Sequence, residues 1–148
     1  MKREYHRRFS TKIEQWLGAG HGSCILRRPN CAQEIATALL HFDETRVYVI
    51  SFVVMPNHVH VLFAPLGEWP LEKIVHSWKR QSAVRINRLI GSSGVLWQRD
   101  YFDQLVRNKK HFARCVRYIR SNPEKAHLLP SHYILYESDL ARAVGTAV

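Results

Sequence analysis

The sequence predicts a single α+β domain in which an antiparallel sheet carries helices on one face, with a further helix near the C-terminus. A length of 148 residues suits one hydrophobic core. Residues 46–55 form an apolar run rich in valine and isoleucine, as in a buried central strand. Residues 58–63 alternate as a second strand, and later segments have the 3.6-residue spacing of helices. Such a mixture is typical of an α+β fold.

The N-terminal part is expected to contain two helices. Residues 11–17 have helical spacing, and the glycines that follow would end a helix there. Residues 23–26 can be extended. Asn30, with Gln33 three positions later, resembles a capping box that opens a second helix.

Turn residues and periodicity define the remaining elements. Pro56 and Asn57 favour a turn, so the two strands that they join are expected to form a hairpin. Pro70 suits the first turn of a long helix with Leu71, Val75, Trp78, Ile86 and Leu89 facing inward. Residues 101–106 are a third expected strand.

The last expected helix covers residues 110–121, and Pro123 should restart or kink it. The tail after Pro130 shows no clear pattern. If residues 23–26 count as a strand, the order becomes β-α-β-β-α-β followed by a helix. That order is the ferredoxin-like pattern.

Positive charge is concentrated in one part of the chain. The net charge is +10, and residues 79–125 contribute nine of these charges through twelve Lys or Arg against three acids. Aromatic residues lie among them. Basic groups contact phosphates and rings stack on unpaired bases, so the mixture suits single-stranded nucleic acid. A solvated basic face over ordinary core aromatics would give the same pattern.

Other classes of protein are disfavoured. The longest apolar run is about half of a membrane span, and the N-terminal residues lack the apolar core of a secretory signal. Three cysteines form an odd and sparse set, which argues against a disulfide scaffold. We therefore expect a cytoplasmic protein without a membrane partner.

His58 and His60 are two apart on a predicted strand, so both imidazoles should point to one face. Their Cα atoms would be roughly 6–7 Å apart, close enough for both rings to bind one divalent ion. Two polar residues on an exposed strand face would look the same. Leu62 stands where a histidine-triad nucleotide hydrolase needs a third histidine, which disfavours that class.

Arg114, Tyr118 and Asn122 follow at spacings of four on a predicted helix, so they share one face. A tyrosine hydroxyl can attack a phosphodiester if a cation offsets the charge that builds up on the phosphoryl oxygens. Asn122 could give an oxygen ligand to the same ion. Alternatively, Tyr118 packs with its hydroxyl at the surface, and Asn122 before Pro123 is a helix N-cap.

Four segments together resemble the REP-associated tyrosine transposases, which belong to the single-tyrosine HUH transposases of small insertion sequences. Residues 53–62 (VVMPNHVHVL) are similar to the family's HUH segment, and residues 118–126 (YIRSNPEKA) to its tyrosine helix. Residues 77–79 and 96–103 resemble connecting signatures in the expected order. The likeness extends over residues 3–128.

The resemblance implies a metal-dependent enzyme that cuts and rejoins one DNA strand. Tyr118 would be the nucleophile, bonding to the 5′-phosphate and freeing a 3′-hydroxyl. His58, His60 and Asn122 would bind Mg²⁺ or Mn²⁺, and no organic cofactor would be needed. The substrate would be single-stranded DNA folded into hairpins, and the protein a monomer or a homodimer. The fold would be a ferredoxin-like sheet with both histidines on a central strand.

The basic residues offer candidate phosphate contacts, namely Lys79, Arg80, Arg99, Arg107, Arg114 and Arg117. Trp97 and Tyr101 could stack on bases or belong to the core. The family usually opens with a strand ahead of the matched region. We therefore expect either that residues 23–26 replace this strand or that the sheet lacks it.

Two functional hypotheses stand beside each other. One is a tyrosine-nucleophile DNA transposase or nickase. The other is a catalytically silent, single-stranded nucleic-acid-binding domain derived from such an enzyme. Retention of His58, His60, Tyr118 and Asn122 favours the first hypothesis, and a missing leading strand would favour the second.

Overall fold

A computed structural model describes residues 11–19, 24–98 and 102–145. Within these ranges a single antiparallel sheet has the strand order β4-β1-β3-β2-β5. Its strands are β1 (Lys12–Leu17), β2 (Val47–Met55), β3 (His58–Pro65), β4 (Phe102–Leu105) and β5 (Ile134–Glu137). The first four have the order and connections of a ferredoxin-like fold, which confirms the predicted fold class. β5 extends the sheet beyond β2.

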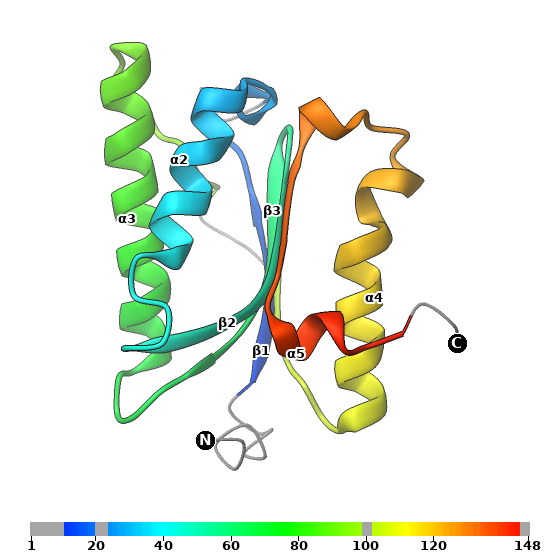
Figure 1. Cartoon of the computed structure of the whole chain (residues 1–148). Coiled ribbons are helices and arrows are strands. Elements are labelled where there is room, and N and C mark those ends of the chain that lie inside the picture. Colours follow the sequence, from blue (N-terminus) through cyan, green and yellow to red (C-terminus); the bar gives the residue numbers. More distant parts are fainter. Residues whose placement is uncertain (1–10, 20–23, 99–101, 146–148) are drawn as a thin grey trace.

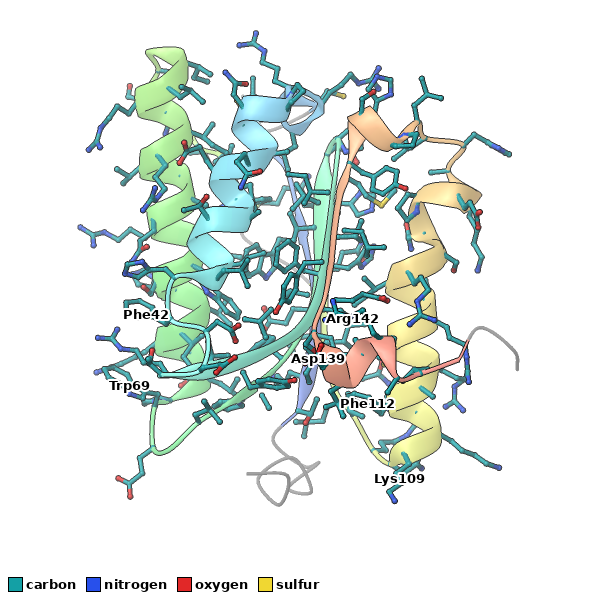
Figure 2. The ribbon with its side chains drawn as sticks, viewed as in Figure 1. Phe42, Trp69, Lys109, Phe112, Asp139 and Arg142 are labelled. Atoms are coloured by element: carbon teal, nitrogen blue, oxygen red, sulfur yellow. The ribbon has the colours of Figure 1, made fainter. Side chains whose placement is uncertain are left out.

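Helices cover both faces of this sheet (Figure 1). The helices are α2 (Pro29–Leu40), α3 (Leu71–Ile90), α4 (Lys109–Lys125) and α5 (Asp139–Arg142), with 3₁₀ turns η3 (Ile25–Arg27) and η4 (Pro130–His132). α2 and α3 lie together on one face, as predicted, and α4 and α5 lie on the opposite face. Figure 2 shows the same division, with Phe112 and Asp139 on one side and Phe42 and Trp69 on the other.

Each face has its own apolar cluster, because strand residues alternate between the two sides. Trp16, Phe63 and Trp78 belong to the cluster under α2 and α3, where Trp16 meets Trp78 with ring centroids 5.9 Å apart. Leu62 and Ile119 belong to the cluster under α4. A bulge between Val49 and Ser51 shifts the β2–β3 register.

The prediction of a helix at residues 11–17 is wrong, because the segment forms β1. Ile13 and Trp16 have a spacing that also fits a helix, but here they are buried on opposite faces of the sheet. β1 pairs with β3 on one edge and β4 on the other, so its backbone hydrogen-bonding groups are used on both sides. This central pairing outweighs local propensity.

β1 also supplies the leading strand that the sequence analysis expected to be absent or replaced. Residues 24–26 form a turn and the start of η3, and residue 23 lies outside the described ranges. The expectation that residues 23–26 serve as a strand therefore fails over its described part. The argument that a missing strand favours a silent domain fails with it.

Smaller predictions at the helices also need correction. α2 starts at Pro29 with Arg28 as its N-cap, so Asn30 is inside the helix and does not open a capping box. Leu89 of α3 is 45% exposed rather than turned inward. α4 continues through Pro123 to Lys125.

The C-terminal tail, for which no structure was predicted, braces α4 against the sheet. Arg120 of α4 donates from Nε to Glu137 Oε2 of β5 at 2.7 Å and from Nη2 to the Ala141 carbonyl at 3.0 Å. Arg117 donates from Nε to the Gly145 carbonyl at 3.0 Å. Among the described helices, none is both long and apolar enough to cross a membrane.

Candidate active site

Two imidazoles lie on the face of the sheet that α4 covers. His58 and His60 alternate along β3, and their ring centroids are 4.9 Å apart with nearly perpendicular planes. β3 is the middle strand, hydrogen-bonded to β1 and β2, so the backbone that holds both rings is fixed on both edges. His60 is only 3% exposed. The two rings therefore form a rigid pair on one face, as strand alternation predicts.

Both imidazoles are neutral near pH 7. Burial lowers the pKa of His58, and burial together with the neighbouring His58 lowers the pKa of His60 to about 4. His58 Nδ1 donates to Asn57 Oδ1 at 2.8 Å, because an amide oxygen can only accept. This bond leaves the Nε2 lone pair of His58 available, and an unprotonated imidazole nitrogen is the form that binds a metal ion.

Tyr118 of α4 stands beside this pair. Its ring centroid is 5.2 Å from that of His60, with the ring planes 84° apart. The side chain is 45% exposed, so the phenol is accessible to a large substrate. Apolar neighbours on α4 such as Val116 and Ile119 are buried in the cluster beneath the helix and set its position on the sheet.

Asn122 lies one turn beyond Tyr118 and is half-buried. α4 advances toward the end of the sheet at which β2 turns into β3 (Figure 1), and His58 is the first residue of β3. The four residues that the resemblance singled out therefore come from only two elements, β3 and α4. In the part of the chain that the structure describes, no three His, Cys, Asp or Glu side chains are grouped to hold a metal ion. Among the described residues, the candidate metal ligands are the two imidazoles and, as a neutral oxygen donor, the Asn122 amide.

An open pocket of about 380 Å³ adjoins Tyr118 and His60. Its other lining residues are Ile13, Glu14, Gln15, Gln104, His111, Arg114 and Cys115. The Glu14 carboxylate accepts from Trp16 Nε1 at 2.8 Å, and Trp16 is packed under α3, on the other face of the sheet. Burial raises the pKa of the Cys115 thiol to about 11, so this group stays protonated and acts as an apolar wall.

His111 is a buried pocket residue that the sequence analysis missed. The backbone N–H of Arg107 donates to His111 Nδ1 at 3.0 Å, and the His111 N–H donates to the side chain of Asn108, the N-cap of α4. Burial, with help from Arg107 and Arg114, lowers the pKa of His111. The ring is therefore neutral, and because Nδ1 accepts, Nε2 carries the proton.

The predicted phosphate contacts are divided between the two faces. Arg107 precedes α4, and Arg114 and Arg117 lie on it, with Arg114 lining the pocket. Lys79 and Arg80 lie on α3, which covers the other face. The Lys79 ammonium is 5.6 Å from the ring centroid of Trp16, and burial lowers its pKa. Arg99 lies outside the described residues.

Trp97, considered as a surface for base stacking, belongs to the core. It is 8% exposed, donates from Nε1 to Ser82 Oγ at 3.0 Å, and meets Trp16 edge to face. Tyr101, the other stacking candidate, lies outside the described residues. Tyr118 is thus the exposed aromatic ring in the described part of the basic segment.

The comparisons with known proteins assign the family. The family model described as "Transposase IS200 like" matches residues 26–122, which is more than half of the chain and includes His58, His60, Tyr118 and Asn122. The chain belongs to the IS200-like transposase family. As an IS200-like transposase, the protein is a DNA-processing enzyme by class.

Solved structures share the fold of this IS200-like transposase. One is the structure of a REP-associated tyrosine transposase bound to a REP hairpin, with a TM-score of 0.65 and 22% identity over 82% of this chain and 70% of that one. Another is a candidate transposase from Deinococcus radiodurans R1, with a TM-score of 0.53 and 17% identity over 80% of this chain and 92% of that one. No curated protein matches the chain significantly.

Proposed function

We propose that this IS200-like transposase cuts and rejoins one strand of hairpin-forming DNA through a covalent bond between Tyr118 and a 5′-phosphate. One observation carries the proposal: an accessible phenol on α4 lies 5.2 Å, ring to ring, from the inner member of a neutral imidazole pair. A nucleophile next to nitrogens that can bind a divalent metal ion is an arrangement suited to phosphoryl transfer.

The donor set suits a divalent metal ion. His58 and His60 supply two neutral nitrogens, and Asn122 can add an amide oxygen. Mixed nitrogen and oxygen ligands of this kind suit Mn²⁺, and Mg²⁺ is accommodated where substrate oxygens complete the shell. When bound, the ion would offset negative charge on the phosphoryl oxygens.

The chain's own residues account for the covalent step. Tyr118 Oη bonds to phosphorus as the bond from phosphorus to the 3′-oxygen breaks. The phenol loses its proton and the departing 3′-oxygen gains one, so the step is balanced and conserves the ester for rejoining. Arg114, one turn before Tyr118, places a guanidinium at the pocket to attract the phosphate backbone.

The resemblance names single-stranded hairpin DNA as the substrate, and the solved relative with TM-score 0.65 is described as bound to a REP hairpin. The positive charge along α4, the helix that carries Tyr118, favours a polyanionic partner. We propose the same class of DNA for this chain.

A covalent adduct tests the proposal. The full-length protein is incubated with end-labelled hairpin DNA and Mn²⁺, and the products are separated on a denaturing gel. We expect a labelled band at the combined mass of protein and DNA fragment, and peptide mapping should place the DNA on Tyr118. Hairpin binding without any adduct, at any Mn²⁺ concentration, would instead support the catalytically silent alternative.

A further inference from the structure

Building on the proposed cleavage reaction, we infer that the pocket beside Tyr118 binds one unpaired nucleobase, that of a nucleotide adjoining the scissile phosphate, and that Gln15 and Gln104 read its edge. The pocket shares Tyr118 and His60 with the reaction centre, so a nucleotide seated in it is a direct neighbour of the attacked phosphorus. The four residues assigned to the chemistry have proposed roles at the metal ion and the phosphate, so we assign base recognition to other residues of the pocket.

Two side-chain amides on strands of the sheet line the pocket. Gln15 of β1 is directly opposite His60 of β3, and Gln104 of β4 is directly opposite Ile13 of β1. Strand alternation therefore puts both amides on the face of His60 and Tyr118. Neither amide has a hydrogen-bond partner within the described residues, although both are half-buried in the pocket lining. Each offers a donor and an acceptor, the combination that reads base edges.

His111 adds one hydrogen-bond donor to the pocket, its Nε2–H group. Because its Nδ1 accepts from the Arg107 backbone, the neutral ring has only Nε2–H to offer a ligand. His111 lies two turns before Tyr118 on α4 and lines the same pocket. Its bond to Arg107 also removes it as a general base for Tyr118, since the one unprotonated nitrogen is occupied.

The volume and lining of the pocket suit a single nucleobase rather than several nucleotides of a strand. A volume of about 380 Å³ is at the lower end of the range for small-molecule sites, roughly 300–1,000 Å³. Ile13 and Cys115 give apolar surface for the faces of a ring, and Arg114 supplies positive charge for the attached phosphate. Unpaired bases are recognised in this way, by contact with their faces and hydrogen bonds to their edges.

The test uses a pool of DNA hairpins with randomised single-stranded flanks and Mn²⁺. Sequencing of the cleaved products should show a preferred base at one position adjoining the cut. Gln15→Leu and Gln104→Leu keep the side-chain size, and each should weaken this preference roughly 5- to 100-fold, as expected for loss of a two-point contact. Gln33→Leu, on the exposed side of α2, is the matched control and should leave the preference unchanged.

Gln104→Glu provides a second variant of nearly the same shape. A carboxylate only accepts, so the preferred base should change to one that donates from its edge, such as cytosine. Circular dichroism checks that each variant is folded. An unaltered base preference in folded Gln104→Glu and both Leu variants would overturn the inference while leaving the cleavage reaction intact.

A binding selection separates this inference from the proposed reaction. The same pool is selected for binding to Tyr118→Phe, which lacks the attacking oxygen but keeps the pocket. If the wild-type protein forms no adduct, the cleavage proposal fails. A base preference in the binding selection that is lost when Gln104→Leu is added to Tyr118→Phe would still support base recognition by the pocket. Selection without any base preference would overturn the inference on its own.

Discussion

His60 and Tyr118 meet edge to face across the boundary between β3 and α4, with ring centroids 5.2 Å apart. His60 lies on the middle strand of the sheet and Tyr118 lies on the amphipathic helix α4. The contact therefore joins two elements that are far apart in the sequence.

Tyr118→Phe should abolish strand cleavage and leave hairpin affinity within about twofold, because only the hydroxyl is removed and the exposed ring stays in place. Cleavage is followed on a denaturing gel and affinity by a gel-shift titration. Tyr136→Phe, whose ring stacks on Phe52 in the other cluster, is the control and should cleave normally. If Tyr118→Phe cleaved the DNA at the wild-type rate, Tyr118 would not be the nucleophile.

His58→Ala and His60→Ala should each raise the Mn²⁺ concentration for half-maximal cleavage at least about tenfold, a loss seen even for residues that only support a metal ligand. The measurement is the initial cleavage rate across a Mn²⁺ titration. His76→Ala, exposed on α3, is the control. If the two site variants followed the wild-type titration, neither histidine would be a ligand.

Arg114→Ala should weaken single-stranded DNA binding and reduce the slope of log affinity against log salt by about 0.7, the value for one phosphate contact. Binding is measured by fluorescence anisotropy at several NaCl concentrations. Arg85→Ala, which removes a partner of Glu34 on the α3 side, should leave the slope unchanged. Equal slopes for wild type and Arg114→Ala would contradict a phosphate contact at this residue.

The free energy of unfolding should depend on pH through His111. Its folded-state pKa lies below the unfolded value of 6.5, so acid protonates the unfolded chain more readily. The stability that the neutral ring confers is complete above about pH 6.5 and is lost as the pH falls below that value. Denaturant unfolding should therefore show the advantage of wild type over His111→Gln shrinking between neutral pH and pH 5. A constant difference across that range would mean that His111 does not titrate as its surroundings indicate.

Arg120→Ala should destabilise the protein by about 1–3 kcal/mol, because Arg120 makes a part-buried ion pair with Glu137 and a bond to the Ala141 carbonyl. The readout is the denaturant midpoint at constant slope. Arg142→Ala removes a mostly exposed pair with Asp139 and an exposed bond to the Glu137 carbonyl, so it should cost less, under about 1 kcal/mol. Equal effects of the two substitutions would show that the Arg120 contacts do not hold α4.

The core elements of the fold were predictable where local pattern and tertiary environment agree. β2, β3, α3 and α4 lie close to their predicted positions because their apolar spacing matches the surface that they bury. β1 was not predictable from its own residues, since Ile13 and Trp16 fit either period and only the partners β3 and β4 decide. The formation of the short strand β5 likewise depends on its pairing with β2, which is distant in the sequence.

The site divides along similar lines. The relation of His58 to His60 follows from strand alternation, and that of Tyr118 to Asn122 from helical spacing, so each pair was visible in the sequence. His111 could also have been found, since it lies two helical turns before Tyr118. Gln15 could not, because its place opposite His60 exists only once residues 12–17 are a strand.

The brace formed by Arg117 and Arg120 with the C-terminal tail ties the position of α4, and with it Tyr118, to that tail. The matched family region stops at Asn122, whereas the brace is anchored on Glu137, Ala141 and Gly145. If the proposed roles hold, inactivating changes can arise in a stretch that bears none of the proposed reacting groups, because loss of the brace would let Tyr118 move away from His58 and His60. Sequence inspection restricted to the motifs would score such a protein as intact.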